Sequence, residues 1–330
     1  MQKHLKNAFI VLFFVFALLA VLGGLTNATE VLKSVNIELL AIACIFFIFS
    51  IIIWLIPWAY LIKKRNPVGF KDSMIIGFSA VYASLTPIQL GADMLRAMSL
   101  KERFNVPYSE SVSASMVVKG LKFLLISLFS GTVILLFISS AEYSVLILAG
   151  LLSGFAVILL ATALFLLPLK KSFGHRIARI FRHFSGKIPL AKRLCKFFES
   201  YSEYLPSLGK KSFLIALLFS GLSLGLEFLA LLFSFKALSI VIPIYSVAVL
   251  FILVSILERT PFLPRGIGVV EGIGFAFLSM PIAVSPPSIQ QIGALLILFD
   301  LVRLVVPAVS SIAVHLVVGL KKNSNYAKHL

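Results

Sequence analysis

The sequence predicts an all-α, polytopic membrane protein with about eight spanning helices, additional re-entrant or broken helices, and two pseudo-repeat halves. Three observations predict this class. Of the 330 residues, 60% are hydrophobic and 13% are charged, against about 45–50% and about 25% in soluble domains. The apolar residues form runs near the ~20 residues that a spanning helix needs. Basic residues gather in alternate connections between these runs, as they do when Lys and Arg stay in the cytoplasm.

The apolar runs give the predicted spans, taken in chain order. The first run follows a basic start that resembles a signal peptide, but its length predicts an uncleaved helix. One run, 244–258, is short, and another, 266–282, begins within a glycine-rich stretch. The predicted spans are 8–26, 37–62, 111–138, 145–168, 212–235, 244–258, 266–282 and 289–319.

The distribution of basic residues predicts that both termini are cytoplasmic. The segment 170–211 holds eleven Lys and Arg and two acidic residues, whereas the alternate loops near 27–36, 139–144 and 283–288 contain one basic residue in all, Lys33. The apolar segment 73–95 is interrupted by "TPIQLGAD" and followed by Arg96. If 73–95 crossed the membrane fully, Arg96, Lys101 and Arg103 would lie outside. The pattern therefore predicts that 73–95 enters and leaves on the same side.

The whole chain, 1–330, is predicted to form one integral membrane domain. Its halves, 1–169 and 212–330, are joined by the basic segment 170–211. Apolar residues of 170–211 recur at helical spacing, with bases on the other face. Two interpretations remain open for this segment: an amphipathic helix lying on anionic lipid, or a solvated cytoplasmic linker.

A short fragment occurs once in each half, inside an interrupted apolar segment. The copies are Pro87-Ile-Gln-Leu-Gly91-Ala-Asp93 and Pro264-Arg-Gly-Ile-Gly268-Val-Val-Glu271. Backbone breaks at membrane depth persist only inside protein or beside a wet cavity, and paired breaks in matching positions indicate substrate sites in transporters. A half-helix beginning after either proline would offer N–H groups and a positive dipole end to an anion. The alternative is tight helix packing at small residues.

Charged residues accompany both breaks and recur within the spans, where each costs about 2.5–3.5 kcal/mol. Arg259 and Arg265 flank the second break and are placed to clamp a phosphate. Asp300 and Arg303 are three residues apart on one helix face and can pair. The candidate substrate-binding residues are Pro87, Gln89, Gly91, Asp93, Arg96, Lys119, Glu227, Arg259, Pro264, Arg265, Gly266, Gly268, Glu271 and Arg303.

Enzyme and nucleic-acid functions find little support in the sequence. There is no P-loop and no Gly-x-Ser-x-Gly motif, and neither the five histidines nor Cys44 and Cys195 have metal-ligand spacing. The formal charge is +17, but the bases lie between apolar runs, where they set topology and meet anionic headgroups. We therefore expect no catalytic residue, cofactor, metal or nucleic-acid partner, unless chemistry occurs within the membrane.

Several stretches resemble a known family. "SAVYASLTPIQLGADMLRAMSLKERFNVPYSESVSASMVVKGLKFLLI" and "FLPRGIGVVEGIGFAFLSM" resemble two signatures of the lysylphosphatidylglycerol synthase transmembrane-region family, which are flippase-like integral membrane proteins. "GLEFLALLFSFKALSI" and "LILFDLVRLVVPAV" resemble its intervening and final helices. The resemblance covers nearly the whole chain. The family pattern falls on Pro87, Leu90, Gly91, Asp93, Arg96, Glu227, Pro264, Gly266, Gly268, Glu271, Gly272 and Arg303.

The chain departs from the family pattern at two positions. Arg265 replaces the first glycine of a Pro-Gly-Gly block, and Lys119 stands where the family usually has a glutamate. Both changes add positive charge. They favour a more anionic headgroup than the lysylated lipid that some relatives move.

The resemblance implies a flippase or transporter in a bacterial or archaeal cytoplasmic (inner) membrane, moving a phospholipid or lipid-linked anionic substrate between leaflets. Transport would be facilitated or ion-coupled, with Asp93, Glu227 and Glu271 as proton-linked candidates. The expected partners are lipids with anionic headgroups and a separate lipid-modifying or glycosyl-transfer enzyme; a homo-oligomer is left open.

Two alternatives belong to other classes. The first is an integral-membrane glycosyltransferase or envelope-assembly enzyme, with a carboxylate base at Asp93, Glu258 or Glu271. The second is a non-catalytic scaffold of a lipid or polysaccharide complex.

Overall fold

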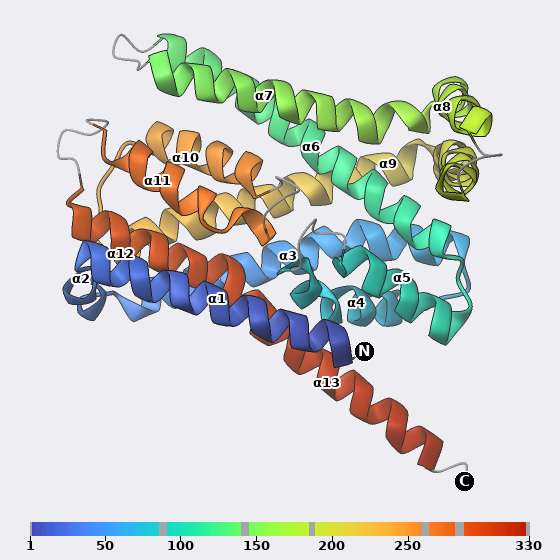
Figure 1. Ribbon diagram of the computed structural model, residues 1–330, viewed down its shortest axis with the longest axis horizontal. Coiled ribbons are helices and arrows are strands. Elements are labelled where there is room, and N and C mark those ends of the chain that lie inside the picture. The colour runs from blue at the N-terminus through green and yellow to red at the C-terminus, as the bar shows by residue number, and fades with distance from the viewer. Residues whose placement is uncertain are drawn as a thin grey trace.

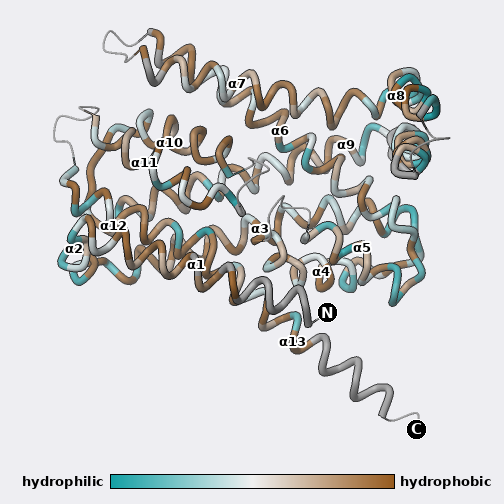
Figure 2. Tube along the Cα trace, in the orientation of Figure 1, coloured by the Kyte–Doolittle hydropathy of each residue, from teal (hydrophilic) through white to brown (hydrophobic). Residues whose placement is uncertain are grey.

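A computed structural model describes residues 2–85, 91–139, 145–184, 189–258, 264–280 and 287–327. Every regular element within these residues is a helix, and the long helices run mainly along the horizontal axis of Figure 1. Their middles are hydrophobic, while hydrophilic residues gather toward the ends of the bundle (Figure 2). The predicted all-α membrane fold is confirmed.

Five helical stretches of the described residues are long and apolar enough to cross a bilayer. They coincide with five of the predicted spans, because long apolar runs favour helices that satisfy their own backbone groups. They are α3 (Ile37–Arg65), most of α6 (Tyr108–Ser139), α7 (Val145–Leu166) with η2 (Leu167–Leu169), the second part of α9 (Pro189–Ala237), and the stretch formed by α12 (Ile289–Asp300), η4 (Leu301–Val305) and α13 (Val306–Ala327).

Two of the other predicted spans form short helices. α10 (Ile244–Leu257) has 14 residues and α11 (Val269–Leu278) has 10, so they rise about 21 Å and about 15 Å at 1.5 Å per residue. Both fall short of the ~30 Å hydrocarbon core. A 3₁₀ turn, η3 (Pro264–Gly266), precedes α11. The number of full crossings therefore stays a prediction.

The interrupted segment of the first half has a similar organisation. α4 (Phe70–Ser79) is followed by the 3₁₀ turn η1 (Val81–Leu85), and α5 (Gly91–Phe104) begins after the first copy of the repeated fragment. Each half thus carries a pair of short helices around that fragment: α4 and α5 in one, α10 and α11 in the other. Whether 73–95 is re-entrant stays a prediction.

The two halves share one interior, because α3 of the first packs along α9 of the second. Phe46 of α3 meets Phe233 of α9 edge-on, with 5.3 Å between ring centroids. Buried Ala43 and Ala230 occupy the same hydrophobic cluster, where their small side chains allow close approach. α1 (Gln2–Thr26) and the short α2 (Thr29–Lys33) pack against α12 on one side of the bundle (Figure 1).

The predicted basic connection, 170–211, is mostly helical. It contains α8 (Lys171–Phe184) and the first part of α9, which bends at Gly209, where φ is 69°. Figure 1 shows α8 nearly end-on beside the end of α7, so it runs across the direction of the long helices. The predicted boundary between this connection and the span 212–235 thus lies close to the kink at which the two helical parts of α9 meet.

The apolar faces of this connection pack against each other and are partly buried. Phe181 of α8 stacks on Phe198 of α9, with 5.7 Å between centroids. The hydroxyl of Tyr201 donates a hydrogen bond to the carbonyl oxygen of Phe165 at 2.7 Å, and burial raises the pKa of this phenol. Ile180, by contrast, is 61% exposed. Most of the predicted apolar stripe is therefore partly covered by protein, and Tyr201 is fully buried.

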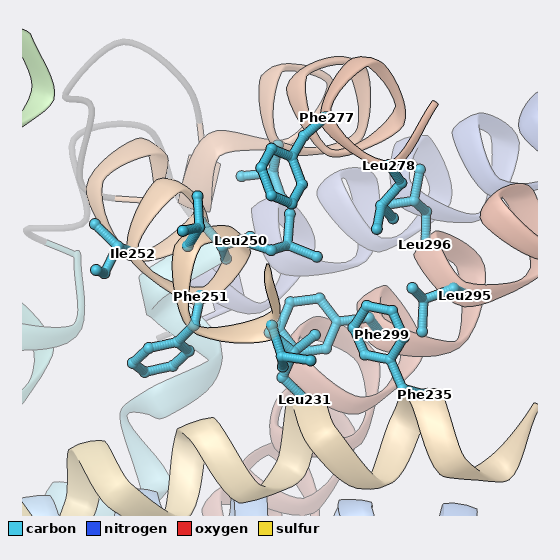
Figure 3. Close-up of a cluster of buried hydrophobic side chains, with 14 of the residues drawn as sticks. Leu231, Phe235, Leu250, Phe251, Ile252, Phe277, Leu278, Leu295, Leu296 and Phe299 are labelled. Atoms are coloured by element: carbon cyan, nitrogen blue, oxygen red, sulfur yellow. The ribbon is translucent and has the colours of Figure 1, made fainter. Parts of the chain in front are cut away.

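A packed hydrophobic cluster fixes the short helices of the second half. Side chains from α9, α10, α11 and α12 meet there, as Figure 3 shows. Close packing of this kind holds backbones in one arrangement. It positions the ends of α11 and α12 that carry the charged residues described next. The labelled members are Leu231, Phe235, Leu250, Phe251, Ile252, Phe277, Leu278, Leu295, Leu296 and Phe299.

Candidate functional site

Arg303 lies at the centre of a buried ionic cluster in the second half. Its side chain is 0% exposed. Nε donates a hydrogen bond to Asp300 Oδ1 at 2.6 Å, and Nη2 donates to Glu271 Oε1 at 2.6 Å. Nη1 contacts Glu258 Oε1 and the carbonyl oxygen of Arg265, each at 3.1 Å. We call Glu258, Arg265, Glu271, Asp300 and Arg303 the Arg303 cluster.

The local backbone explains how Arg303 reaches so many partners. Residues Leu301–Val305 form a π-helical turn between α12 and α13, a feature that is common at functional sites. The carbonyl oxygen of Arg303 accepts a hydrogen bond from Arg265 Nη1 at 2.6 Å. The two arginines therefore bind each other's backbone and share Glu258, which lies 3.8 Å from Arg265 Nη2.

The second copy of the repeated fragment turns sharply before α11. Arg265, Gly266 and Gly268 all have positive φ, at 49°, 71° and 88°. The N–H of Gly268 donates to Glu271 Oε2 at 2.5 Å. The sequence predicts that the start of α11 binds an anion from outside the protein. In the structure, the carboxylate of Glu271, in the first turn of α11, caps this helix start. Arg265 points among protein groups, with its side chain 15% exposed.

Gly266 should be far less tolerant of a side chain than Gly268. A Cβ at Gly266 would lie 2.7 Å from the carbonyl oxygen of Leu257, whereas nothing lies within 4 Å of one at Gly268. For Gly268→Ala we expect a loss of about 1–2 kcal/mol from the left-handed conformation. For Gly266→Ala we expect about 2–5 kcal/mol, because overpacking adds to the same strain. Unfolding of the purified variants in detergent measures both; equal losses would contradict the close approach.

A second cluster of charged residues lies in the first half, around Asp93 at the start of α5. Asp93 Oδ1 is 3.3 Å from Arg96 Nη1, and Asp93 Oδ2 binds Lys119 Nζ. Arg96 also donates from Nε to the carbonyl oxygen of Gly77 at 3.2 Å. Asp93 and Arg96 are 5% and 2% exposed. This arrangement pairs a carboxylate with two cations from different helices.

One helical turn along α6, Lys122 makes a further ion pair. Its Nζ lies 2.5 Å from Oε1 of Glu227 on α9. The side chains are 9% and 15% exposed, so Lys122 reaches a protein partner rather than snorkelling to an interface. We call Asp93, Arg96, Lys119, Lys122 and Glu227 the Asp93 cluster.

An aromatic stripe on α3 links the two clusters. Phe47, Trp54 and Trp58 are spaced at i, i+7 and i+11, which places them on one face of the helix. Arg265 lies 5.8 Å from the centroid of Phe47, and Arg96 lies 5.1 Å and 5.5 Å from the two tryptophans. Seven residues of helix span about 10.5 Å. The clusters therefore occupy neighbouring levels of α3, on either side of its midpoint.

The same stripe also receives Lys122, whose Nζ is 5.8 Å from the Trp54 ring. Cation–π contacts of this kind contribute about 0.5–2 kcal/mol, more when desolvated. They give these cations a favourable neighbour in addition to their carboxylate partners. Lys119 is the most accessible base of the Asp93 cluster, with its side chain 21% exposed.

The structure brings together most of the predicted site residues. Gly91 begins α5, Pro264 begins η3, and Gly266 and Gly268 form the turn before α11. The charged candidates divide between the two clusters. Pro87, Gln89 and Arg259 lie outside the described residues, so the predicted clamp by Arg259 and Arg265 stays a prediction.

Other site residues were absent from the predicted set. Lys122, Glu258 and Asp300 complete the ionic clusters, and the aromatic stripe contacts both clusters. The sequence carried signals for some of them, because Asp300 precedes Arg303 by three residues and the aromatic residues recur on one helical face. Within the part of the chain that the structure describes, no group of three His, Cys, Asp or Glu side chains is arranged to hold a metal ion.

A family model described as "Lysylphosphatidylglycerol synthase TM region" matches residues 8–317, a stretch that includes both clusters and the aromatic stripe. The chain belongs to this family. It is a multi-pass membrane protein of a lipid-related family, and the resemblance seen in its motifs is confirmed. No curated protein and no solved structure matches the chain. The lipid and the direction of any transport are therefore matters for proposal.

Proposed function

We propose that this protein moves an anionic phospholipid, or another lipid-linked anionic substrate, between the leaflets of a bacterial or archaeal cytoplasmic membrane. The observation that supports this most is the Asp93 cluster. It holds three basic and two acidic side chains on α5, α6 and α9, and α6 and α9 contain stretches long enough to cross a bilayer. A cluster with excess positive charge between such helices attracts a headgroup phosphate, and its cost in lipid is compensated when an anion binds.

Exchange of partners at Lys119 explains how a headgroup could bind without leaving a charge unpaired. Lys119 shares Asp93 with Arg96. When a phosphate takes Lys119, Asp93 keeps Arg96 as its partner. The ammonium then exchanges one anion for another, which avoids the several kcal/mol that an unpaired buried charge costs.

The aromatic stripe offers a route between the clusters. Arg96, which shares Asp93 with Lys119, lies over Trp54, and Arg265 lies over Phe47, about 10.5 Å farther along the same face of α3. A headgroup leaving Lys119 would follow this face toward Arg265. A headgroup that binds weakly at each of two sites can leave as well as enter. Movement through a pathway of several sites requires both. The acyl chains would stay in the surrounding lipid.

Lys119→Met tests this proposal. In liposomes with labelled phosphatidylglycerol or phosphatidylcholine, we expect wild-type protein to speed the loss of outer-leaflet label, with a preference for the anionic lipid. Lys119→Met should reduce that rate at least about tenfold, because a charge-assisted contact contributes about 1.5–3 kcal/mol. The variant should still fold, since Asp93 retains Arg96.

Lys236→Met is the matched control. Lys236 is also a lysine on a long helix, but it is exposed and lies 5.1 Å from the Phe233 ring, outside both clusters. Its rate should equal that of the wild type. If wild-type liposomes move no lipid class faster than protein-free liposomes at any pH, the proposed function is wrong.

A further inference from the structure

Asp300 differs from the other buried carboxylates of the Arg303 cluster. It is 1% exposed, and its Oδ1 accepts the hydrogen bond from Arg303 Nε. Its other oxygen, Oδ2, is buried without a hydrogen-bond partner. An ionised carboxylate can only accept hydrogen bonds, and leaving one oxygen of a buried carboxylate unpaired is costly.

The guanidinium of Arg303 bears on the unpartnered oxygen of Asp300. Nε–H and Nη2–H point from the same edge of the planar guanidinium, an edge that one carboxylate commonly occupies in a bidentate fashion. Here that edge binds two different carboxyls, Asp300 at Nε and Glu271 at Nη2. Two carboxylates side by side repel each other, and such pairs commonly share a proton.

Among the residues that the structure describes, the surrounding charges do not neutralise a third carboxylate. Among the described residues, the cluster contains three carboxyls and two guanidiniums, and one of the carboxyls, Glu258, also lies close to both arginines. α1 has no charged side chain between Ile10 and Thr26, and the charged residues of α3 lie at its ends. Other charged groups on elements packed nearby have partners of their own: Glu30 with Lys33 and Glu227 with Lys122. His315 of α13 packs on Tyr82.

We propose that Asp300 is a proton-binding site, and that its carboxyl is neutral in this conformation. Protonation of Oδ2 converts the carboxylate into a carboxylic acid with one O–H donor. This places a donor beside the Glu271 carboxylate and leaves two ionised carboxyls, Glu258 and Glu271, with two arginines. Loss of that proton adds one negative charge to the cluster and weakens the hold of Arg303 on its other partners.

The three acidic residues that the sequence suggested for proton coupling are each paired more fully. Asp93 binds two cations, and Glu227 binds Lys122. Glu271 binds Arg303 through Oε1 and the Gly268 N–H through Oε2. Contacts with cations and N–H groups favour the ionised form of a carboxyl. Asp300 is the member of the Arg303 cluster with an oxygen left for a proton.

A proton site beside Arg265 also gives the proposed transport an ion to couple to, and this part of the inference rests on the proposed function. With Asp300 protonated, Arg265 and Arg303 are matched by Glu258 and Glu271. With Asp300 ionised, the additional negative charge competes with an anionic headgroup for the arginines. Headgroup release and proton release would therefore be linked.

Infrared spectroscopy of purified protein tests the proton site without any transport assay. The wild-type spectrum should contain the carbonyl stretching band of a protonated carboxylic acid, shifted in D₂O. This band should be lost in Asp300→Asn and kept in Glu199→Gln, a matched variant that removes a carboxylate from a guanidinium outside the cluster. Thermal unfolding in detergent gives a second readout. Asp300→Asn should unfold near the wild-type midpoint, because an amide resembles a neutral acid, whereas Glu271→Gln should unfold at a lower temperature.

Two results would overturn the proton site. One is a band that persists in Asp300→Asn; the other is an Asp300→Asn variant that fails to fold or is destabilised as much as Glu271→Gln. In liposomes, the wild-type lipid movement should change with pH and that of Asp300→Asn should not. If the band behaves as expected but no lipid moves, the proton site holds and the proposed function fails.

Discussion

Arg303→Met is expected to abolish the stable fold. Three carboxyl side chains bind this guanidinium, which is fully buried. Methionine fills a similar volume but leaves those carboxyls without their main cation. Breaking a buried ion pair by removing one partner costs about 3–5 kcal/mol, a large share of the about 5–15 kcal/mol that keeps a protein folded. The yield of monodisperse protein and the unfolding midpoint in detergent measure the loss.

Two further variants provide comparisons for Arg303→Met: one keeps a cation at position 303, and one removes an exposed arginine elsewhere. Arg303→Lys keeps a cation but cannot reach Asp300, Glu271 and Glu258 together, so we expect an intermediate loss of stability. Arg182→Met removes an arginine from an exposed pair with Glu199 on α8 and α9, where water screens the interaction, and should leave the midpoint nearly unchanged. An Arg303→Met protein as stable as the wild type would show that the Arg303 cluster does not hold α10, α11 and α12 together.

Removing both charges of the Lys122–Glu227 pair should largely preserve stability but reduce transport. Lys122→Met alone leaves Glu227 buried without its cation, and we expect a loss of about 3–5 kcal/mol. The double variant Lys122→Met, Glu227→Met removes both charges and should regain most of that stability, because apolar residues often replace a buried pair without loss. Its lipid movement should nevertheless fall at least about tenfold, which corresponds to about 1.4 kcal/mol of headgroup binding.

The comparison of these two variants decides the role of the pair. Stability comes from unfolding in detergent and transport from the liposome assay, with Lys236→Met as the reference for both. A double variant that regains stability and also moves lipid at the wild-type rate would make the pair purely structural. A double variant no more stable than Lys122→Met would indicate that Glu227 has a further role in packing α9 against α6.

Much of the fold could be predicted because its signals are local. The five long spans follow from runs of apolar residues, since each residue's preference for lipid depends little on distant neighbours. The helices α5 and α11 begin within the repeated Pro- and Gly-containing fragments, at Gly91 and Val269, because proline and glycine disrupt helices by their own backbone properties. Pairing of Asp300 with Arg303 was also predictable, because residues three apart meet on one helical face.

Pairings between distant segments could not be predicted. Arg303 and Glu271 are 32 residues apart, and Lys122 and Glu227 are 105 residues apart. The sequence identified most of these residues as costly charges within apolar runs, but it could not say which carboxylate meets which cation. It also could not show that Glu271 caps α11 itself, since that contact depends on the turn made by Gly266 and Gly268.

The sequence by itself determined the class of the protein, the five long apolar helices, the two interrupted segments and the family, because hydropathy, glycine and proline act over a few residues. The tertiary structure decided that α10 and α11 are short, that α3 and α9 join the halves, and that one aromatic face of α3 receives cations from both clusters. It also decided which carboxyl oxygen of the Arg303 cluster lacks a partner. These features depend on contacts between helices that are far apart in the chain, where packing and ion pairing, rather than local preference, select the arrangement.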